Sequence, residues 1–193
     1  MSVSPQAVLD FWFLPVDEPG HGQPRELWFR QDASFDAAIR TRFMAAISAA
    51  LEGGLREWDN APQGALARIL LLDQFTRNVF RGSAAAFSGD ALAQEAARAL
   101  CNAGHDQALP PLQRVFAYLP FEHAEDAAMQ GRSVSLFTAL AAADAELADF
   151  LGYAEQHRDA IARFGRFPGR NAALGRSSSA AELDYLARPN VSS

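Results

Sequence analysis

Residues 62–82 read PQGALARILLLDQFTRNVFRG, and this stretch decides the fold class. Pro62 is typical of the first turn of a helix, and Gly82 predicts where the helix has ended. Two opposite faces of this helix are apolar, one with Leu66, Ile69, Leu70 and Phe80 and the other with Leu71, Leu72, Phe75 and Val79. A helix that is apolar nearly all round belongs in the middle of a helical array.

Helical patterns continue on both sides of this stretch. Every fourth residue from Phe35 to Leu51 is apolar, and Ser4 and Pro5 predict the start of a helix that contains VLDFWF. Further helices are predicted at 90–102, from Pro110 to near Tyr118 where Pro120 should interrupt it, at 122–130, 133–143 and 147–164, and after a capping box at Ser179 and Glu182. No useful strand-period run occurs. We therefore predict an all-α fold, a single domain over residues 1–193 with seven to nine helices in an antiparallel array.

Composition excludes several kinds of chemistry. The 193 residues are 49% hydrophobic and 21% charged, which fits one globular domain. All 17 basic residues are arginines, so a Schiff-base lysine, covalently bound pyridoxal phosphate and a phosphate-loop lysine are excluded. No glycine-rich dinucleotide fingerprint and no nucleophile elbow is present. We therefore predict no cofactor.

The charge of the chain and the lack of targeting patterns limit the classes of partner and the cellular compartment that we expect. The formal charge of -6 disfavours nucleic-acid binding, and no run approaches the apolar length of a membrane span. The chain begins without a signal-peptide pattern, and the single Cys101 excludes an intramolecular disulfide. We expect a cytoplasmic protein that binds neither nucleic acid nor membranes. The sequence does not predict the oligomeric state.

Charged residues interrupt the apolar stripe of the central helix. Asp73 and Arg77 lie at its centre, one helical turn apart in the favourable order for an ion pair. Such groups must neutralise each other or line a wet pocket. Asn78 and Arg81 extend the polar run and favour a site, while a purely structural pair is the alternative.

A second polar cluster is FEHAED, residues 121–126. Two carboxylates one turn apart, Glu122 and Asp126, next to His123 are suited to acid/base chemistry. The same acidic residues after Pro120 could instead complement a helix N-terminus. The spacing is poor for a metal, because the one E-x-x-H pattern, Glu18 to His21, lies in a glycine- and proline-rich loop, and we predict no metal site.

The third polar region is the run from His157 to Arg176. The segment 160–181 contains four arginines and no carboxylate. Arginines that alternate with glycines, with Asn171 nearby, fit an anion site. Alternatively, the arginines pair with acids such as Glu122, Glu125 and Asp126 and dock the loop. His157 lies on an apolar stripe, where a histidine is either a satisfied core residue or a catalyst.

Together, VLDFWF, LLDQFTRNVFRG, FAYLPFEHAED and FGRFPGRNAALGRSSSAAE resemble the bacterial family called domain of unknown function 924. The resemblance spans nearly the whole chain and implies an all-helical, tetratricopeptide-like fold, although we find neither a 34-residue repeat nor the repeat consensus. It implies no reaction. It points to Asp73, Gln74, Arg77, Asn78, His123, Glu125, His157, Arg166, Arg170, Asn171 and Arg176. Gly169 departs from the pattern, since the family resemblance implies a histidine there.

Three interpretations follow. In the first, arginines hold a phosphorylated or carboxylated small molecule for hydrolysis or transfer, while His123 or His157, oriented by Glu125 or Asp126, moves protons. The predicted ligand residues are Asp73, Arg77, Asn78, Arg166, Arg170, Asn171 and Arg176. In the second, a groove binds a partner peptide without catalysis, as tetratricopeptide-like proteins do. In the third, the polar runs are buried networks that specify packing. A pocket of roughly 300 to 1,000 Å³ favours the first interpretation.

Overall fold

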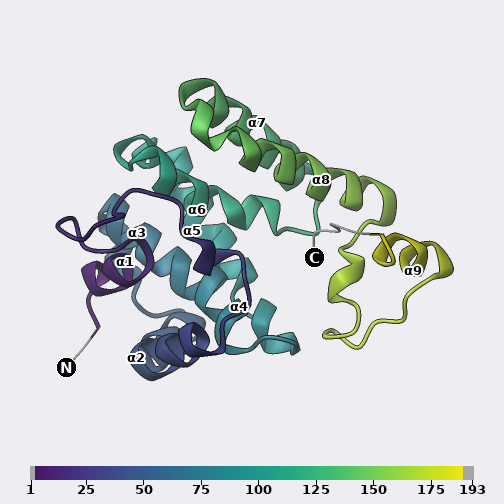
Figure 1. Ribbon diagram of the computed structural model, residues 1–193, viewed down its shortest axis with the longest axis horizontal. Helices are drawn as coiled ribbons and strands as arrows, with labels where there is room; N and C mark the ends of the chain where they lie inside the picture. The colour runs from purple at the N-terminus through teal and green to yellow at the C-terminus, as the bar shows by residue number, and fades with distance from the viewer. Residues whose placement is uncertain (1–2, 189–193) are drawn as a thin grey trace. The chain divides into compact units, whose positions relative to one another are not determined.

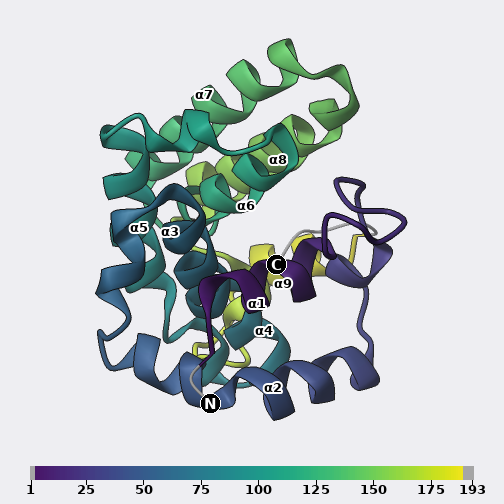
Figure 2. The ribbon, with the colours of Figure 1, turned by 90° about the vertical axis from the view of Figure 1, so that its left-hand side faces the viewer.

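The computed structural model describes residues 3–188, and all regular elements in that range are helical (Figures 1 and 2). The α-helices are α1 (Pro5–Phe13), α2 (Ala33–Leu51), α3 (Pro62–Ile69), α4 (Thr76–Val79), α5 (Asp90–Asn102), α6 (Pro111–Glu122), α7 (Ala127–Ala143), α8 (Ala148–Phe164) and α9 (Ala180–Leu186). Short 3-10 helices are η1 (Glu26–Trp28), η2 (Arg56–Asn60), η4 (Ala84–Phe87), η5 (His105–Ala108), η6 (Ala145–Leu147) and η7 (Pro168–Arg170), and η3 (Leu70–Phe75) is a π-helix. The predicted all-α fold is confirmed.

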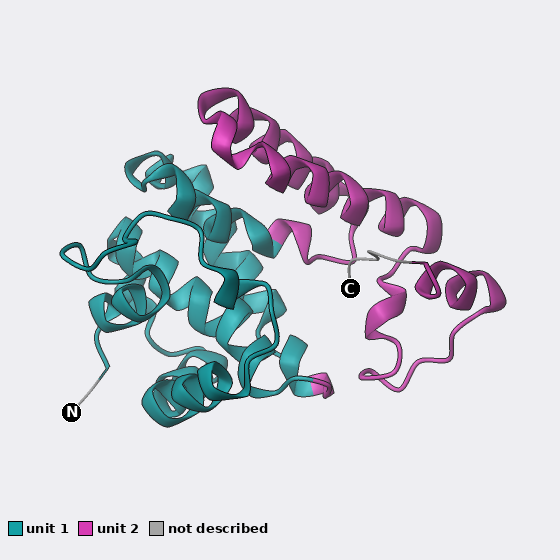
Figure 3. Cartoon of the chain, in the orientation of Figure 1, with its two compact units in different colours: residues 1–81, 85–120 teal, residues 82–84, 121–193 magenta. Residues whose placement is uncertain are grey.

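The helix predicted from Pro62 is continuous, because α3, η3 and α4 follow one another without a break. When α3, η3 and α4 are counted as one helix, the described residues contain eight helices, as the prediction of seven to nine allows. The chain divides into two compact units (Figure 3). Unit 1 contains the described residues up to 81 and residues 85–120, and unit 2 contains residues 82–84 and those from 121 onward. The prediction of one domain over residues 1–193 stays a prediction.

In unit 1, the continuous helix contacts several neighbours. Its α3 part contacts α1 and α5, and α2 contacts η3 and α4. Side chains from both predicted apolar faces are fully buried, among them Leu66, Leu70, Leu71 and Phe75. Burial of each such side chain stabilises the fold by about 1.5–3 kcal/mol. Both apolar faces are therefore buried because other helices surround this one, as the sequence predicts.

The π-helical segment η3, which contains Asp73, gives the central helix a wider turn. Its carbonyl groups find other partners, and the Thr76 hydroxyl donates to Leu72 O at 2.7 Å. Gly89 packs so tightly against the same carbonyl that a β-carbon at this position would collide with it. Glycine at position 89 is therefore required by this close approach.

Aromatic side chains fill the interior of unit 1. The Trp12 ring lies 5.5 Å from the rings of Phe75 and Phe116, measured between centroids. Trp28 stacks on Trp12 at 5.9 Å, and its indole N–H donates to Trp12 O at 3.0 Å. Aromatic side chains each bury roughly 150–250 Å², so these few residues supply much of the apolar area of unit 1.

In unit 2, α7 and α8 lie side by side as a hairpin joined through η6 (Figures 1 and 2). Phe137 from α7 stacks on Phe150 from α8 at 6.4 Å between centroids. Gly165 ends α8 at a φ of 68°, as predicted from its place after Phe164. The predicted capping box is also confirmed, since Ser179 and Glu182 exchange both hydrogen bonds at the start of α9.

The helix boundaries around Pro120 differ from the prediction. The helix α6 continues through Pro120 to Glu122 instead of ending near Tyr118, and no helix spans 122–130. Pro120 has no N–H to donate to the carbonyl of Phe116, and the helix continues for only two residues beyond it. The break comes at 123–126, and α7 begins at Ala127, before the predicted Ser133, because Asp126 caps it through Met129 N at 2.9 Å.

Candidate functional site

Three of the predicted ligand residues lie in unit 1, on η3 and α4. The Arg77 guanidinium lies 3.0 Å from the buried Asp73 carboxylate, and it donates two hydrogen bonds to Asp90 at 2.8 and 3.1 Å. Burial alone would lower the pKa of Arg77, but the charges of Asp73 and Asp90 outweigh it and raise the pKa above its ordinary value. The ion pair that the i, i+4 spacing predicts is therefore present, extended by a second carboxylate from α5.

Asn78 also has a partner within unit 1. Its amide donates to Asp36 of α2 at 2.7 Å, and Arg81 contacts both oxygens of that carboxylate. Asp73, Arg77 and Asn78 thus connect the central helix to α5 and α2. These contacts agree with the structural alternative for this polar run, and their assignment as ligand residues stays a prediction.

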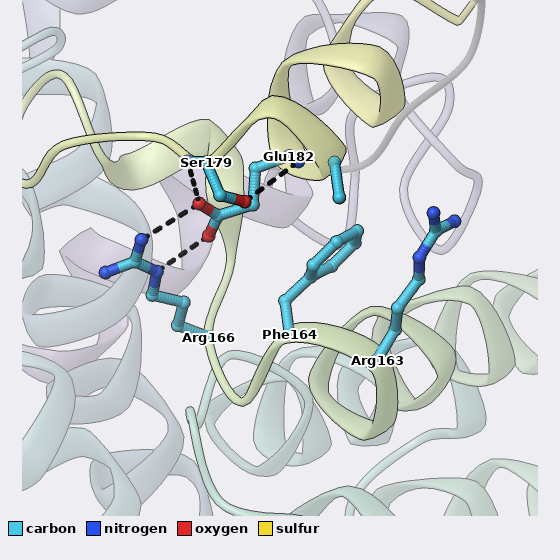
Figure 4. A pocket seen from close by; sticks show the side chains of 6 residues that line it. Arg163, Phe164, Arg166, Ser179 and Glu182 are labelled. Atoms are coloured by element: carbon cyan, nitrogen blue, oxygen red, sulfur yellow. Dashed lines mark hydrogen bonds and ion pairs between the residues drawn. The ribbon is translucent and has the colours of Figure 1, made fainter.

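The other predicted residues lie in unit 2, where residues 165–176 form what we call the arginine loop. Arg166 donates to both Glu182 carboxylate oxygens at 2.7 and 2.9 Å. Arg166 and the backbone N–H of Ser179 lower the pKa of Glu182 far below its usual range. Figure 4 shows this pair at the start of α9.

Arg176 is held in the same way by Glu125. The two groups form a bidentate pair with N–O distances of 2.7 and 2.9 Å, and Arg176 also donates to Asn171 Oδ1 at 3.0 Å. Burial would raise the pKa of Glu125, but Arg176, the Phe167 N–H and the charge of Arg170 together lower it. The contact between Arg176 and Glu125 is the docking interaction that the sequence offers as the alternative to an anion site.

His157 has a buried carboxylate partner, Glu122, at the end of α6. Its Nδ1 lies 3.1 Å from Glu122 Oε1 and 2.9 Å from Tyr153 O. A carbonyl oxygen only accepts hydrogen bonds, so Nδ1 carries a hydrogen and, in the neutral ring, Nε2 is the nitrogen that can take up a proton. Histidine, carboxylate and fixed tautomer form the arrangement of a general base.

His157 and Arg170 both lie against the ring of Phe167 in the arginine loop. The His157 ring lies edge-on to Phe167 at 5.3 Å, and the Arg170 guanidinium lies over the same ring at 4.5 Å. His123 completes the group, 6.3 Å from His157 between ring centroids. We call His123, His157, Phe167 and Arg170 the His–Arg cluster. Because Arg170 and His157 are only 4% and 6% exposed, the cluster is largely buried.

A hollow of about 500 Å³ lies beside the arginine loop (Figure 4). Arg163 and Arg166 line it on opposite sides of Phe164, together with Ser179, Ala181 and Glu182. The Arg163 guanidinium lies 4.7 Å from the Phe164 ring centre and, among the described residues, makes no ion pair. Of the ligand residues predicted from sequence, Arg166 alone lines this hollow.

Arg163 was not among the candidate residues named from the sequence, and the pairing of Glu122 with His157 was not predicted either. Glu122 and His157 are 35 positions apart, and no local pattern relates positions so far apart. Arg163 is visible in the sequence as a basic residue of a segment without acids, but its place on a predicted helix gave no sign that it lines a hollow. The segment's charge of +4 was the one available signal.

Within residues 3–188, no group of three or more histidine, cysteine, aspartate or glutamate side chains could hold a metal ion. None of the helices within that range is both long enough and apolar enough to cross a membrane.

Fold and site together define an all-helical protein with a buried histidine and arginine cluster. Residues 8–190 match the family described as bacterial protein of unknown function (DUF924), and the chain belongs to this family. The solved structure of a protein of unknown function from Agrobacterium tumefaciens is 40% identical, covers 95% of this chain and 96% of its own, and superposes with a TM-score of 0.84. Comparison with curated proteins gives no match.

Proposed function

We propose that this protein binds a phosphorylated or carboxylated small molecule in unit 2, at the hollow between Arg163 and Arg166. One observation carries the proposal. Two guanidinium groups line a hollow of about 500 Å³, and Arg163 has no carboxylate partner among the described residues. A guanidinium fork matches the geometry of carboxylate and phosphate oxygens, so it is the group expected to bind such an anion.

The lining fits a ligand that has an anionic and an apolar part. Arg163 and Arg166 contribute two positive charges and Glu182 one negative charge, so the hollow keeps a net charge of +1. The Phe164 ring offers an apolar surface. Because the Ser179 oxygen already accepts from Glu182 N at 3.3 Å, its O–H can donate to a ligand oxygen. The volume lies in the range of small-molecule sites, roughly 300–1,000 Å³.

The remaining residues of the arginine loop keep Arg166 in position. Arg170 and Asn171 are 4% and 1% exposed, and Arg176 is paired with Glu125. In this proposal they order the loop and do not touch the ligand, which narrows the ligand set predicted from sequence. Variants distinguish a residue that contacts the ligand from one that orders the loop. Replacing a contacting residue changes the affinity for the ligand, whereas replacing an ordering residue also changes the stability of the fold.

A second candidate function is acid/base catalysis at the His–Arg cluster. The fixed Nδ1 of His157 favours it, because Glu122 and Tyr153 O hold the ring so that Nε2 is the basic nitrogen. Arg166 and Phe167 are adjacent in sequence, so the hollow and the cluster share the arginine loop. Hydrolysis or transfer on the bound anion is the chemistry these groups suit. Loss of turnover with retained binding in His157→Gln would support this function.

The test is a thermal-shift titration of the full chain with inorganic phosphate, sugar phosphates, nucleoside monophosphates and citrate. A ligand at a hundred times its Kd stabilises the native state by about 2.7 kcal/mol, which shifts the Tm of a domain of this size by several degrees. Arg163→Ala should abolish that shift.

The matched control is Arg158→Ala, because Arg158 lies on the same helix but pairs with the exposed Asp159 and does not line the hollow. This control should keep the full shift. If no anion stabilises the wild-type chain, the small-molecule proposal fails and a peptide-binding module becomes the better interpretation. If both arginine variants reduce the shift equally, the effect is one of general surface charge.

A further inference from the structure

The pair formed by Arg166 and Glu182 lies at the hollow where we propose that an anion binds. Both side chains line that hollow, and Figure 4 shows the Glu182 carboxylate directed at the Arg166 guanidinium. Glu182 carries the same chemical group as a carboxylated ligand. The chain therefore places an anion of its own against one of the two guanidinium groups that line the hollow.

Glu182 and a backbone carbonyl use the donors of Arg166 that a bidentate contact needs. The Nε and Nη2 atoms donate to the two oxygens of Glu182 at 2.7 and 2.9 Å, and Nη2 also donates to Ser177 O at 2.9 Å. A guanidinium holds two oxygens along the edge of Nε and Nη2 or along the edge of Nη1 and Nη2. Both edges include Nη2, whose two hydrogens are taken. A ligand can therefore reach Arg166 only through Nη1 while Glu182 stays in place.

Arg163, the other guanidinium of the hollow, is in a different state. It makes no ion pair among the described residues, and its guanidinium lies over the Phe164 ring at 4.7 Å. Its N–H donors are therefore available for a ligand, whereas those of Arg166 are mostly satisfied by the protein. An anion that is to be held by both arginines must displace the Glu182 carboxylate.

The position of Glu182 depends on how α9 packs in unit 2. The Tyr185 ring of α9 lies 5.0 Å from the Phe164 ring of α8 between centroids, and Tyr185 also packs against Ile161 and Phe167. Tyr185 and Glu182 are one helical turn apart, so the aromatic contact keeps the carboxylate beside Arg166. A change at Tyr185 would loosen this arrangement without changing any charge.

Acid does not release Glu182 under ordinary conditions. Arg166 and the backbone N–H of Ser179 lower the pKa of Glu182 far below its usual range. Its carboxylate therefore stays ionised at neutral and mildly acidic pH, where phosphate and carboxylate ligands are ionised as well. A competing anion is the agent that can take its place at Arg166.

We propose that Glu182 is an autoinhibitory group, which occupies Arg166 and weakens the binding of anions to the hollow. This inference rests on the proposed function, since it requires that an anion binds there. In the resting protein an anion is held mainly by Arg163. When Glu182 is displaced, the oxygens of the ligand accept from Nε and Nη2 of Arg166, and both arginines hold the ligand.

The experiment is a calorimetric titration of the full chain with inorganic phosphate and citrate. Glu182→Gln removes the competing charge and should raise the affinity about fivefold or more, as expected when an ion pair no longer competes with the ligand. Asp184→Asn is the matched control, because Asp184 is an exposed acid of the same helix that does not line the hollow. It should change the affinity by less than about twofold, since an exposed charge is screened by salt.

A double-mutant cycle connects the gain to Arg166. Arg166→Ala removes the group for which Glu182 and the ligand compete, so Glu182→Gln should give no gain in that background. A general effect of charge would give the same gain with and without Arg166.

A second variant changes no charge and serves if Glu182→Gln does not fold, which circular dichroism verifies. Tyr185→Ala loosens the packing of α9 and should also raise the affinity for phosphate. Leu183→Ala is its control, because Leu183 lies on the same helix and is 57% exposed, and it should leave the affinity unchanged.

Each outcome decides the proposal. A gain in Glu182→Gln that Asp184→Asn lacks and that needs Arg166 supports it. Autoinhibition is overturned, and the proposed function stands, if wild type and Glu182→Gln bind phosphate equally and Arg163→Ala abolishes the binding. It is also overturned if both acid variants gain equally, if the gain persists without Arg166, or if Tyr185→Ala binds no more tightly than Leu183→Ala. If neither wild type nor Glu182→Gln binds an anion, the proposed function and the autoinhibition fail together.

Discussion

Arg77 in unit 1 and Arg176 in unit 2 are almost equally exposed, at 20% and 23% of their side chains. Their carboxylate partners differ, because Asp73 is 1% exposed while Glu125 is 25% exposed. A carboxylate in water loses little when its partner is removed, whereas one removed from water depends on that partner. An arginine–carboxylate pair therefore belongs to the core in unit 1 and orders the arginine loop in unit 2.

The largest effect is expected for Asp73→Asn. This change removes the buried charge that faces Arg77 and should lower the free energy of unfolding by about 3–5 kcal/mol. Urea denaturation monitored by circular dichroism measures it. Asp90→Asn is the internal control, since Asp90 pairs with the same guanidinium but is 24% exposed, and its loss should be clearly smaller. Equal losses in the two variants would show that burial of the carboxylate does not decide the cost.

A glycine-to-alanine pair tests packing in both units. Gly89→Ala should destabilise the protein by about 1–3 kcal/mol, because the new β-carbon collides with Leu72 O beside the π-helix. Gly152→Ala in the α8 helix meets no atom within 4 Å and should stabilise the protein by about 0.5–1 kcal/mol. Thermal unfolding of both variants compares them directly. The close approach of Gly89 is refuted if both changes have the same sign.

A smaller and pH-dependent effect is expected for Glu125→Gln. At pH 7 the loss should be about 1 kcal/mol, as for a partly exposed pair. The folded protein lowers the pKa of Glu125 below 4.5, so its carboxylate stabilises the fold above pH 4.5 and that contribution is lost as the pH falls further. Denaturation series at pH 7 and pH 3 should show a smaller difference between variant and wild type at pH 3 than at pH 7. A difference that is unchanged at pH 3 would mean that the charge is not involved.

The smallest effect is expected for Arg56→Ala in unit 1. Arg56 pairs with Glu95 at 3.0 Å, but the two side chains are 53% and 58% exposed. We expect no measurable change in the urea midpoint. Since Arg56 and Arg77 belong to the same unit, a neutral result here would show that exposure of the partners, and not the unit, separates strong pairs from weak ones.

The helical fold was predictable because its signals are local. The apolar positions from Leu66 to Val79, the Gly165 end of α8 and the Ser179 capping box each depend on residues within a turn or two. Pro120 misled the prediction because a proline's effect depends on its distance from the helix end. That end is set by Asp126, which caps α7, and by Gln130, which donates to Glu122 O and Ala124 O at 2.6 and 2.8 Å.

The candidate sites were predictable only in part. Charge patterning indicated the arginine loop, and the i, i+4 spacing indicated the Asp73–Arg77 pair. Arg166 pairs with Glu182, and Arg176 pairs with Glu125. These partners depend on the folding back of α8 and α9, so no local sequence pattern predicts them. A hollow of about 200 Å³ in unit 1 was not predicted, since its lining comes from α1, α3, α6 and the loop at His21.

The π-helical segment also sets the phase of the central helix. A π-turn holds about one residue more than an α-turn, so residues before Leu70 and after Phe75 are rotated relative to an uninterrupted α-helix. A regular α-helix over the same residues would turn one half by about 100° against the other, because the π-turn would no longer absorb the extra residue. Arg68 and Asp59, 2.6 Å apart, would then be out of phase with Arg77 and Asp90. The irregular turn thus acts as a register shift that allows one helix to match two sets of neighbours.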